Sequence, residues 1–309
     1  MMMRKLKSYG MELRATFLTA TIVSIVLGTS IAWAKDRVFG LGWFALSLIA
    51  GALLHAGTNV ANDYFDHKSG GDDINTEYVR PFSGGSRMIQ QGLLKPREVL
   101  LEGSILLAVG TVIGFYLAFA RGLFILIIGL VGLFSGIFYA GPPFKLANRG
   151  AGEAFVGINF GTLMTMGAYY VQTQNLSIEP LVASIPIFLL IFSVVYINEF
   201  LDFNADKAVG KKTLVVRFGR EKAAKGYAIL MVGVYLSILI GVLVKLMPVT
   251  TLISFATLPI AVNAVAKTFK HHSTPIELVP SNAATILCHL LTGTLISVGY
   301  LAAFLLVLR

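Results

Sequence analysis

The feature that most restricts the fold of this 309-residue chain is a series of long apolar stretches. A helix needs about 20 residues to cross the ~30 Å hydrocarbon layer of a bilayer, and in lipid it must satisfy its own backbone hydrogen bonds. Only 13% of the residues are charged, which excludes a disordered chain and an ordinary cytosolic enzyme, and the stretches are too long for barrel strands. We therefore expect an all-α polytopic membrane protein with nine transmembrane helices. The expected spans are residues 15–34, 41–61, 99–119, 122–140, 151–171, 180–201, 223–244, 248–267 and 282–308.

Charge distinguishes the two faces of the expected bundle. Nine crossings put the chain ends on opposite sides, and twenty of the 25 Lys and Arg residues then fall on the side of the N-terminus. Such an excess marks the cytoplasmic side, so we expect a multi-pass protein of the cell membrane with a cytoplasmic N-terminus. Nearly all the acids lie on this side as well. The positive-inside rule concerns only Lys and Arg and does not explain this. They indicate a polar cytoplasmic cap, built from the loops between spans two and three and between spans six and seven.

One five-residue pattern occurs twice in the chain. Residues 62–66 and 198–202 both read Asn, acid, aromatic, apolar, Asp, and each closes an apolar stretch on the cytoplasmic side. The interval of four spans predicts a duplicated four-helix unit, at about residues 15–140 and 151–267, with a final helix at about 282–308, all within a single domain of residues 1–309. Coincidence between two short strings is the alternative. Membrane folds built from repeats tend to place their site at the repeat interface.

The two patterns supply two clusters of oxygen ligands. Asn62 and Asp66 are four residues apart, as are Asp202 and Asp206, so each pair shares a helix face, and Asp72 follows the first cluster in a glycine-rich loop. Carboxylates gathered at a membrane boundary need a positive partner. Because cysteine is absent here and histidine is scarce, the chemistry favours Mg²⁺ with phosphate oxygens over zinc. Helix-end acids paired with loop lysines are the alternative.

Basic residues beside the acids are candidate anion binders. Lys68 follows the first cluster and Lys211 follows the second, while Arg80 begins a segment of small residues whose backbone amides can approach an oxyanion. A net charge of +9 in a membrane protein is explained by anionic lipid or by an anionic substrate, so no nucleic acid partner is expected. A purely topological role for each basic residue is the alternative.

At these residues the chain resembles the UbiA superfamily of intramembrane prenyltransferases. Span two ends in the family's N-D-x-x-D pattern with a further Asp downstream, and span six ends in its D-x-x-x-D pattern. Segments 62–66, 81–85, 149–153 and 167–173 are similar to those of the 1,4-dihydroxy-2-naphthoate prenyltransferases of the menaquinone branch. One departure is that Tyr139 and Lys145 lie six residues apart with two prolines between them, where the family often has Tyr-x-x-x-Lys.

The resemblance implies an enzyme and a role for each candidate residue. The implied reaction is Mg²⁺-dependent, with Mn²⁺ as a possible substitute, and transfers a polyprenyl group from an allylic diphosphate to a small aromatic acceptor through an allylic carbocation. The acceptor that the resemblance implies is 1,4-dihydroxy-2-naphthoate, in quinone biosynthesis. The implied metal ligands are Asn62, Asp66, Asp72, Asp202 and Asp206, all but Asp72 also being catalytic. The implied substrate contacts are Asp63, Lys68, Arg80, Tyr139, Lys145, Asn198 and Lys211.

Several alternatives remain open at this point. The expected partners are the polyprenyl diphosphate, the aromatic acceptor and the lipid bilayer, with no obligate protein partner. Two alternatives keep the chemistry but change the acceptor, to 4-hydroxybenzoate or to a glyceryl phosphate lipid precursor. An alternative of another class is a cation-coupled transporter. It would need ionisable residues near the middle of the membrane, whereas the acids of this chain gather at one boundary.

Overall fold

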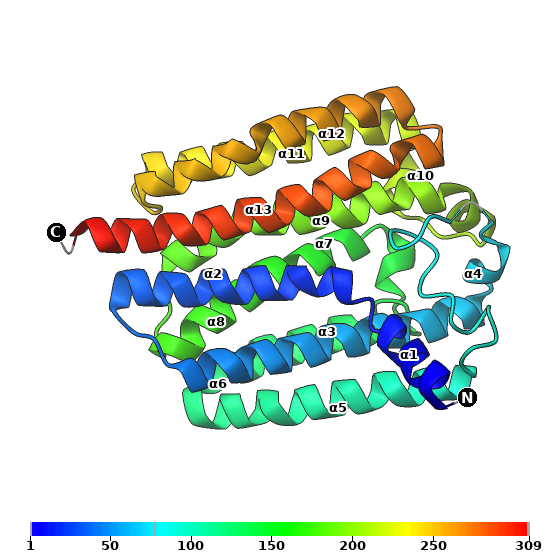
Figure 1. Ribbon diagram of the computed structural model, residues 1–309, viewed down its shortest axis with the longest axis horizontal. Helices are drawn as coiled ribbons and strands as arrows, with labels where there is room; N and C mark the ends of the chain where they lie inside the picture. The colour runs from blue at the N-terminus through cyan, green and yellow to red at the C-terminus, as the bar shows by residue number, and fades with distance from the viewer. Residues whose placement is uncertain (1, 77, 308–309) are drawn as a thin grey trace.

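The computed structural model describes residues 2–76 and 78–307 as a bundle of helices that run roughly along one axis (Figure 1). No β-strand occurs among these residues. In chain order the elements are α1 (Met2–Glu12), η1 (Ala15–Leu18), α2 (Thr19–Asp36), α3 (Leu41–Ser69), α4 (Gly71–Ile74), α5 (Pro96–Arg121), α6 (Leu123–Ile137), η2 (Leu146–Arg149), α7 (Gly152–Gly157), η3 (Ile158–Leu163), α8 (Met164–Thr173), α9 (Ile178–Ala208), α10 (Leu214–Phe218), α11 (Arg220–Leu243), η4 (Val249–Thr257), α12 (Leu258–His271) and α13 (Pro275–Val307).

Seven segments of the described chain are long and apolar enough to cross a membrane. They are Lys5–Asp36, Leu41–Ser69, Pro96–Arg121, Ile178–Ala208, Arg220–Leu243, Val249–His271 and Pro275–Leu306. α6 is a shorter apolar helix, and α7, η3 and α8 follow one another without interruption, with η3 wound as a π-helix. These elements cover the spans expected at 122–140 and 151–171. The all-α multi-pass membrane protein is thus confirmed, while nine crossings and the duplication stay predictions.

The two helices that carry the acidic patterns extend beyond their apolar stretches. α3 continues past the expected end at residue 61 as far as Ser69, where Gly70 closes it with φ of 77°. This left-handed conformation favours glycine. α9 continues from the expected residue 201 to Ala208. The acids and asparagines of both patterns are therefore helical and keep the spacing of four residues that places them on common faces.

The beginning of the chain differs from the single first span expected at 15–34. α1 is a separate helix that ends at Glu12, Arg14 adopts a left-handed conformation with φ of 51°, and α2 starts only after the short helix η1. α1 lies across the end of the bundle (Figure 1). One side of it is buried through Ser8 and Glu12, while Leu6 on the other side is 62% exposed. This pattern is typical of a helix at a membrane surface.

The helices divide into inner and outer members. In the segments Lys5–Asp36 and Ile178–Ala208, 56% of the apolar stretch is buried, whereas only 17% is buried in Pro96–Arg121. The main apolar core joins α2, α9, α11 and α13 through residues such as Leu27, Phe200 and Tyr227. Phe119 of α5 is 92% exposed, as expected of a side chain that faces lipid.

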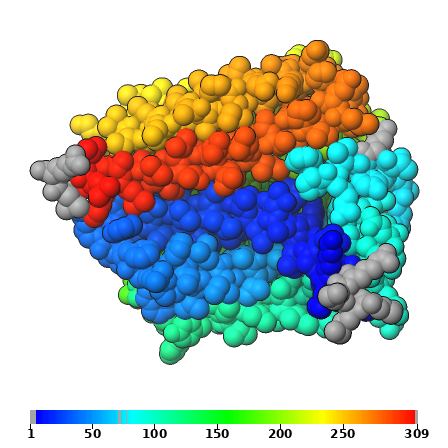
Figure 2. All heavy atoms as spheres, viewed as in Figure 1, coloured from blue at the N-terminus to red at the C-terminus, as the bar shows by residue number. Residues whose placement is uncertain are grey.

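Both long polar segments meet at one end of the bundle. The chain between α3 and α5 and the chain between α9 and α11 lie at the same end as α1 (Figure 1). In the space-filling view, residues of the first segment cover the adjacent helix ends (Figure 2). Because α3 and α9 also end here, their acidic patterns come together beneath these segments.

Candidate functional site

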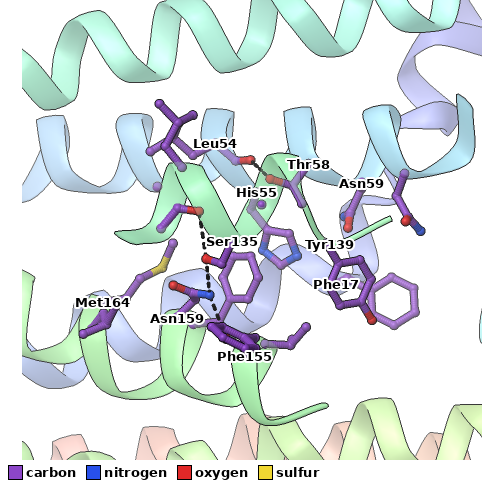
Figure 3. A pocket seen from close by; sticks show the side chains of 18 of the residues that line it. Phe17, Leu54, His55, Thr58, Asn59, Ser135, Tyr139, Phe155, Asn159 and Met164 are labelled. Carbon is purple, nitrogen blue, oxygen red and sulfur yellow. Dashed lines mark hydrogen bonds between the residues drawn. The ribbon is translucent and has the colours of Figure 1, made fainter. Parts of the chain in front are cut away.

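A cavity of about 410 Å³ lies between α3, α5, α6, α7–α8 and α9 (Figure 3). Much of its wall is apolar, from side chains such as Leu54, Leu107 and Met164. At the ends of α3 and α9, by contrast, the wall is polar and charged. Its lining there includes Asn62, Asp66, Asn75, Tyr139, Asn198, Glu199, Asp202, Asp206, Lys211 and Thr213. The cavity therefore joins an acidic compartment to a long apolar one.

Lys211 connects the two acidic patterns across the cavity. Its Nζ lies 3.0 Å from Oδ1 of Asp66 on α3 and 3.4 Å from Oδ1 of Asp206 on α9. Asn62 donates from Nδ2 to Oδ2 of Asp66 at 3.1 Å, so the predicted one-turn pair is formed. The two acidic patterns therefore face the same end of the cavity.

The segment before α10 is fixed by hydrogen bonds on both sides, and this determines where Lys211 points. The Lys211 N–H donates to the Asp206 carbonyl at 2.9 Å. The Leu214 N–H donates to Oε1 of Glu153 at 2.8 Å and the Val215 N–H to Oε2 of Glu199 at 3.4 Å. Glu153, which is 1% exposed, and Glu199 thus accept two of the N–H groups that a helix start leaves unpaired.

The charge around Lys211 keeps it a cation. Burial lowers the pKa of an ammonium group, but the carboxylates of Asp66 and Asp206 more than compensate, so the pKa of Lys211 lies above its usual range. Tyr139 lies near the carboxylates of Glu199, Glu153 and Asp66. Burial, together with the negative charge of Glu199, raises the pKa of its phenol, which therefore stays neutral and keeps a proton to donate.

Two residues that the sequence analysis did not single out complete the polar end. Asn75, from the segment after α4, donates from Nδ2 to Oδ1 of Asp202 at 2.6 Å. Asn282 of α13 donates from Nδ2 to Oδ1 of Asn198 at 2.8 Å. The amide oxygen of Asn198 thus accepts a hydrogen bond from α13, and its amide NH2 is a group of the kind that donates to an anion. Neither partner could be found from local spacing, because each lies more than 80 residues from the group that it contacts.

Four predicted substrate contacts do not line the cavity. Lys68, Arg80 and Lys145 are exposed, and Asp63 is buried in a separate network. Oδ2 of Asp63 accepts the N–H of Ser86 at 2.8 Å, and Oδ1 lies 3.7 Å from the Arg14 guanidinium. The side chain of Asp72, a predicted metal ligand, lies outside the part of the chain whose side chains are described.

The oxygen donors at the polar end fit a magnesium ion that also binds a phosphate. Among the described residues no three His, Cys, Asp or Glu side chains form a ready metal cluster. Mg²⁺ does not require one, because it takes one or two carboxylates and completes its shell with water and phosphate oxygens. Oδ1 of Asn62, a residue that lines the cavity beside Asp66, is buried and accepts no hydrogen bond from the side chains and backbone that the structure describes. A hard cation would satisfy this oxygen.

Fold and site together define an integral membrane protein that encloses an acidic site continuous with an apolar cavity. The model of the UbiA prenyltransferase family matches residues 21–278, and the chain belongs to this family. It is therefore a prenyltransferase, and the alternative of a cation-coupled transporter is excluded. The resemblance described from the motifs is thereby confirmed.

The chain is similar over most of its length to a naphthoate prenyltransferase and to a naphthoquinone phytyltransferase. The chain is 27% identical over 287 residues to the 1,4-dihydroxy-2-naphthoate octaprenyltransferase of Bacillus subtilis, covering 93% of this chain and 90% of that protein. It is 28% identical over 284 residues to the 2-carboxy-1,4-naphthoquinone phytyltransferase of Synechocystis sp., covering 91% and 89%. These similarities match the menaquinone branch.

Solved structures of family members share the fold. A UbiA homologue from Archaeoglobus fulgidus, bound to DMAPP and Mg²⁺, superposes with a TM-score of 0.61 at 18% identity, over 94% of this chain and 99% of the other. A homologue from Aeropyrum pernix gives a TM-score of 0.66 at 16% identity, over 91% and 97%.

Proposed function

We propose that this protein transfers a polyprenyl group from an allylic diphosphate to 1,4-dihydroxy-2-naphthoate, with Mg²⁺ as cofactor. The observation that carries the proposal is the meeting of Asp66, Asp202, Asp206 and Lys211 at one end of a largely apolar cavity. A polyprenyl diphosphate has the same division, with a charged head and a long apolar tail. The choice of acceptor is supported by the naphthoate relatives.

The chain's own residues have distinct tasks in this proposal. Asp66, Asp202, Asp206 and Asn62 would hold Mg²⁺, which neutralises charge on the diphosphate as it leaves. Lys211 and the Asn198 amide would donate to diphosphate oxygens, and the neutral Tyr139 phenol would donate a further hydrogen bond. The apolar wall would hold the tail and keep water from the allylic cation. Mn²⁺ would substitute for Mg²⁺, since both accept oxygen ligands.

The proposed orientation follows from charge. The acidic end, with the N-terminal helix and both long polar segments, would face the cytoplasm as a cap, in a protein of the cell membrane. A water-soluble acceptor and the diphosphate head would then reach the site from the same side. No nucleic acid and no obligate protein partner is required.

Alanine substitution of the three cavity acids tests the proposal. Asp66→Ala, Asp202→Ala and Asp206→Ala should each lower turnover at least about 100-fold, because the leaving diphosphate loses its charge compensation. The measurement is prenylation of 1,4-dihydroxy-2-naphthoate by purified protein, with 4-hydroxybenzoate as the competing acceptor. Asp73→Ala is the matched control, since this carboxylate is half exposed, lies 3.5 Å from His67 and does not line the cavity. Near-normal turnover of a cavity variant would contradict its role.

Removal of metal tests the cofactor separately. Protein treated with a chelator should lose activity, and Mg²⁺ or Mn²⁺ should restore it, whereas full activity after chelation would overturn the assignment. Preference for 4-hydroxybenzoate would keep the reaction class but change the acceptor.

A further inference from the structure

The cavity holds a second set of polar groups away from the acids, and the proposed reaction has so far assigned them no task. Thr58 and Asn59 project from α3, Ser135 from α6 and Asn159 from η3 (Figure 3). They line the same cavity as the acids but sit among apolar side chains. An amide in such surroundings is costly unless its hydrogen bonds are made.

Two hydrogen bonds from the amide nitrogen of Asn159 fix its side chain, and the amide oxygen takes part in neither. Its Nδ2 donates to Oγ of Ser135 at 2.7 Å and to the carbonyl of Phe155 at 2.7 Å (Figure 3). Its Oδ1 is buried and accepts no hydrogen bond within the described part of the chain. The residue belongs to the π-helical segment η3, a distortion that recurs at functional sites because it redirects side chains.

Asn59 on α3 provides a hydrogen-bond donor, its amide nitrogen, which complements the acceptor oxygen of Asn159. Its Nδ2 is buried and donates to no partner among the residues that the structure describes. It precedes Asn62 by one helical turn and Asp66 by seven residues, which is about 10 Å along α3. The rings of Tyr139 and Phe155 lie in the same part of the cavity (Figure 3). This region is therefore close enough to the acids to hold the molecule that receives the prenyl group.

The chemistry of the two amides determines which substrate fits there. A polyprenyl tail has no polar atoms, so a tail packed on Asn59 and Asn159 would leave both groups unpaired. A hydroxylated aromatic ring offers donors for Oδ1 of Asn159 and acceptors for Nδ2 of Asn59. We propose that these two residues form the subsite that binds the oxygen atoms of the aromatic acceptor and orients its ring. The inference rests on the proposed function and deepens it.

Steady-state kinetics of Asn159→Leu test the subsite. The variant should raise the KM for 1,4-dihydroxy-2-naphthoate roughly tenfold, because one buried hydrogen bond is lost, and leave the KM for prenyl diphosphate unchanged. Thr165→Val is the matched control. Thr165 is buried six residues further on with an unpaired Oγ1, but it does not line the cavity, so both KM values should stay as in the wild type.

Inhibitor binding separates recognition from a general structural role. Naphthoates that lack one hydroxyl group are measured as competitive inhibitors against the acceptor. In the wild type at least one should bind more weakly than the dihydroxy parent, and in Asn159→Leu this difference should vanish, since the hydroxyl has lost its partner. If Asn159→Leu does not yield monodisperse protein, Asn59→Leu replaces it with the same expectation.

The outcomes that overturn the subsite are distinct from those that overturn the function. If the wild type prenylates naphthoate while Asn159→Leu keeps its acceptor KM and its discrimination between inhibitors, the subsite is wrong and the function stands. Equal increases in both KM values would likewise reject the subsite. A wild type that prenylates no naphthoate would overturn the proposed function and the subsite with it.

Discussion

Lys211 supplies the positive charge that balances the carboxylates at the acidic end of the cavity. The carboxylates of Asp66 and Asp206 come from two helices, and each alone would carry an uncompensated charge away from bulk water. The ammonium group of Lys211 contacts both, at 3.0 and 3.4 Å, and so joins the two patterns. In the proposed reaction the same group would pair with the diphosphate, while Mg²⁺ would offset part of the acid charge.

Replacement of Lys211 should therefore affect substrate binding more than any neighbouring basic residue. Lys211→Met should raise the KM for prenyl diphosphate at least tenfold, because a charge-assisted hydrogen bond to the anion is lost. Lys212→Met is the matched control, since Lys212 is exposed and does not line the cavity. The two variants are compared in the same prenylation assay. Equal effects would show that general positive charge, and not this position, matters.

At the scale of elements, α1 acts on the site through the segment between α4 and α5. Glu12, at the end of α1, accepts the hydroxyl of Ser86, and the Ser86 N–H donates to Asp63 of α3. Ser83, Gly84 and Gly85, just before Ser86, line the cavity. The first helix thus fixes a part of the cavity wall that lies more than 70 residues later in the sequence.

Loss of this contact should loosen the segment without touching the acids. Glu12→Ala should lower the free energy of unfolding by about 1–3 kcal/mol, since a buried hydroxyl loses its acceptor. It should also speed tryptic cleavage after Arg87. Glu12→Gln keeps an acceptor of the same shape and should be close to the wild type. If Glu12→Ala resists trypsin as the wild type does, α1 does not hold the segment.

The helices were predictable from sequence, whereas their long-range partners were not. Apolar length and the four-residue spacing were sufficient to place Asn62 with Asp66 on one helix and Asp202 with Asp206 on another. Asn75, which contacts Asp202, lies 127 residues away from it, and no local pattern marks such a pair. The break at Arg14 and the π-helix η3 were also missed. Both are backbone irregularities inside apolar sequence, where hydrophobicity alone carries no signal.

At the scale of the whole molecule, the two ends of the bundle differ in kind. The end that carries α1, α4 and α10 holds the acids and the long polar segments, while the connections α2–α3 and α8–α9 at the other end are short (Figure 1). Such an asymmetry suits an enzyme that receives polar substrates from one side of the membrane and an apolar tail from the bilayer.

Labelling of single cysteines tests the proposed orientation. Cys288 is the only cysteine of the sequence and is buried, so Cys288→Ala provides a background without thiols. In that background Asn175→Cys, in the exposed α8–α9 connection, should react with a membrane-impermeant maleimide in intact cells. Ser273→Cys, in the exposed α12–α13 connection, should react only after the cells are permeabilised. The opposite labelling pattern would show that the acidic end faces away from the cytoplasm.

The bond between Lys211 and Asp66 joins positions 145 residues apart, and this has a consequence for how the protein is made. As the ribosome adds residues in order, α3 enters the bilayer long before its counter-charge exists. Until Lys211 has been synthesised, the Asp66 carboxylate must stay in contact with water, which is available only at the membrane boundary. Biogenesis thus gives a reason, independent of catalysis, for these acids to lie at helix ends and not deeper in the lipid.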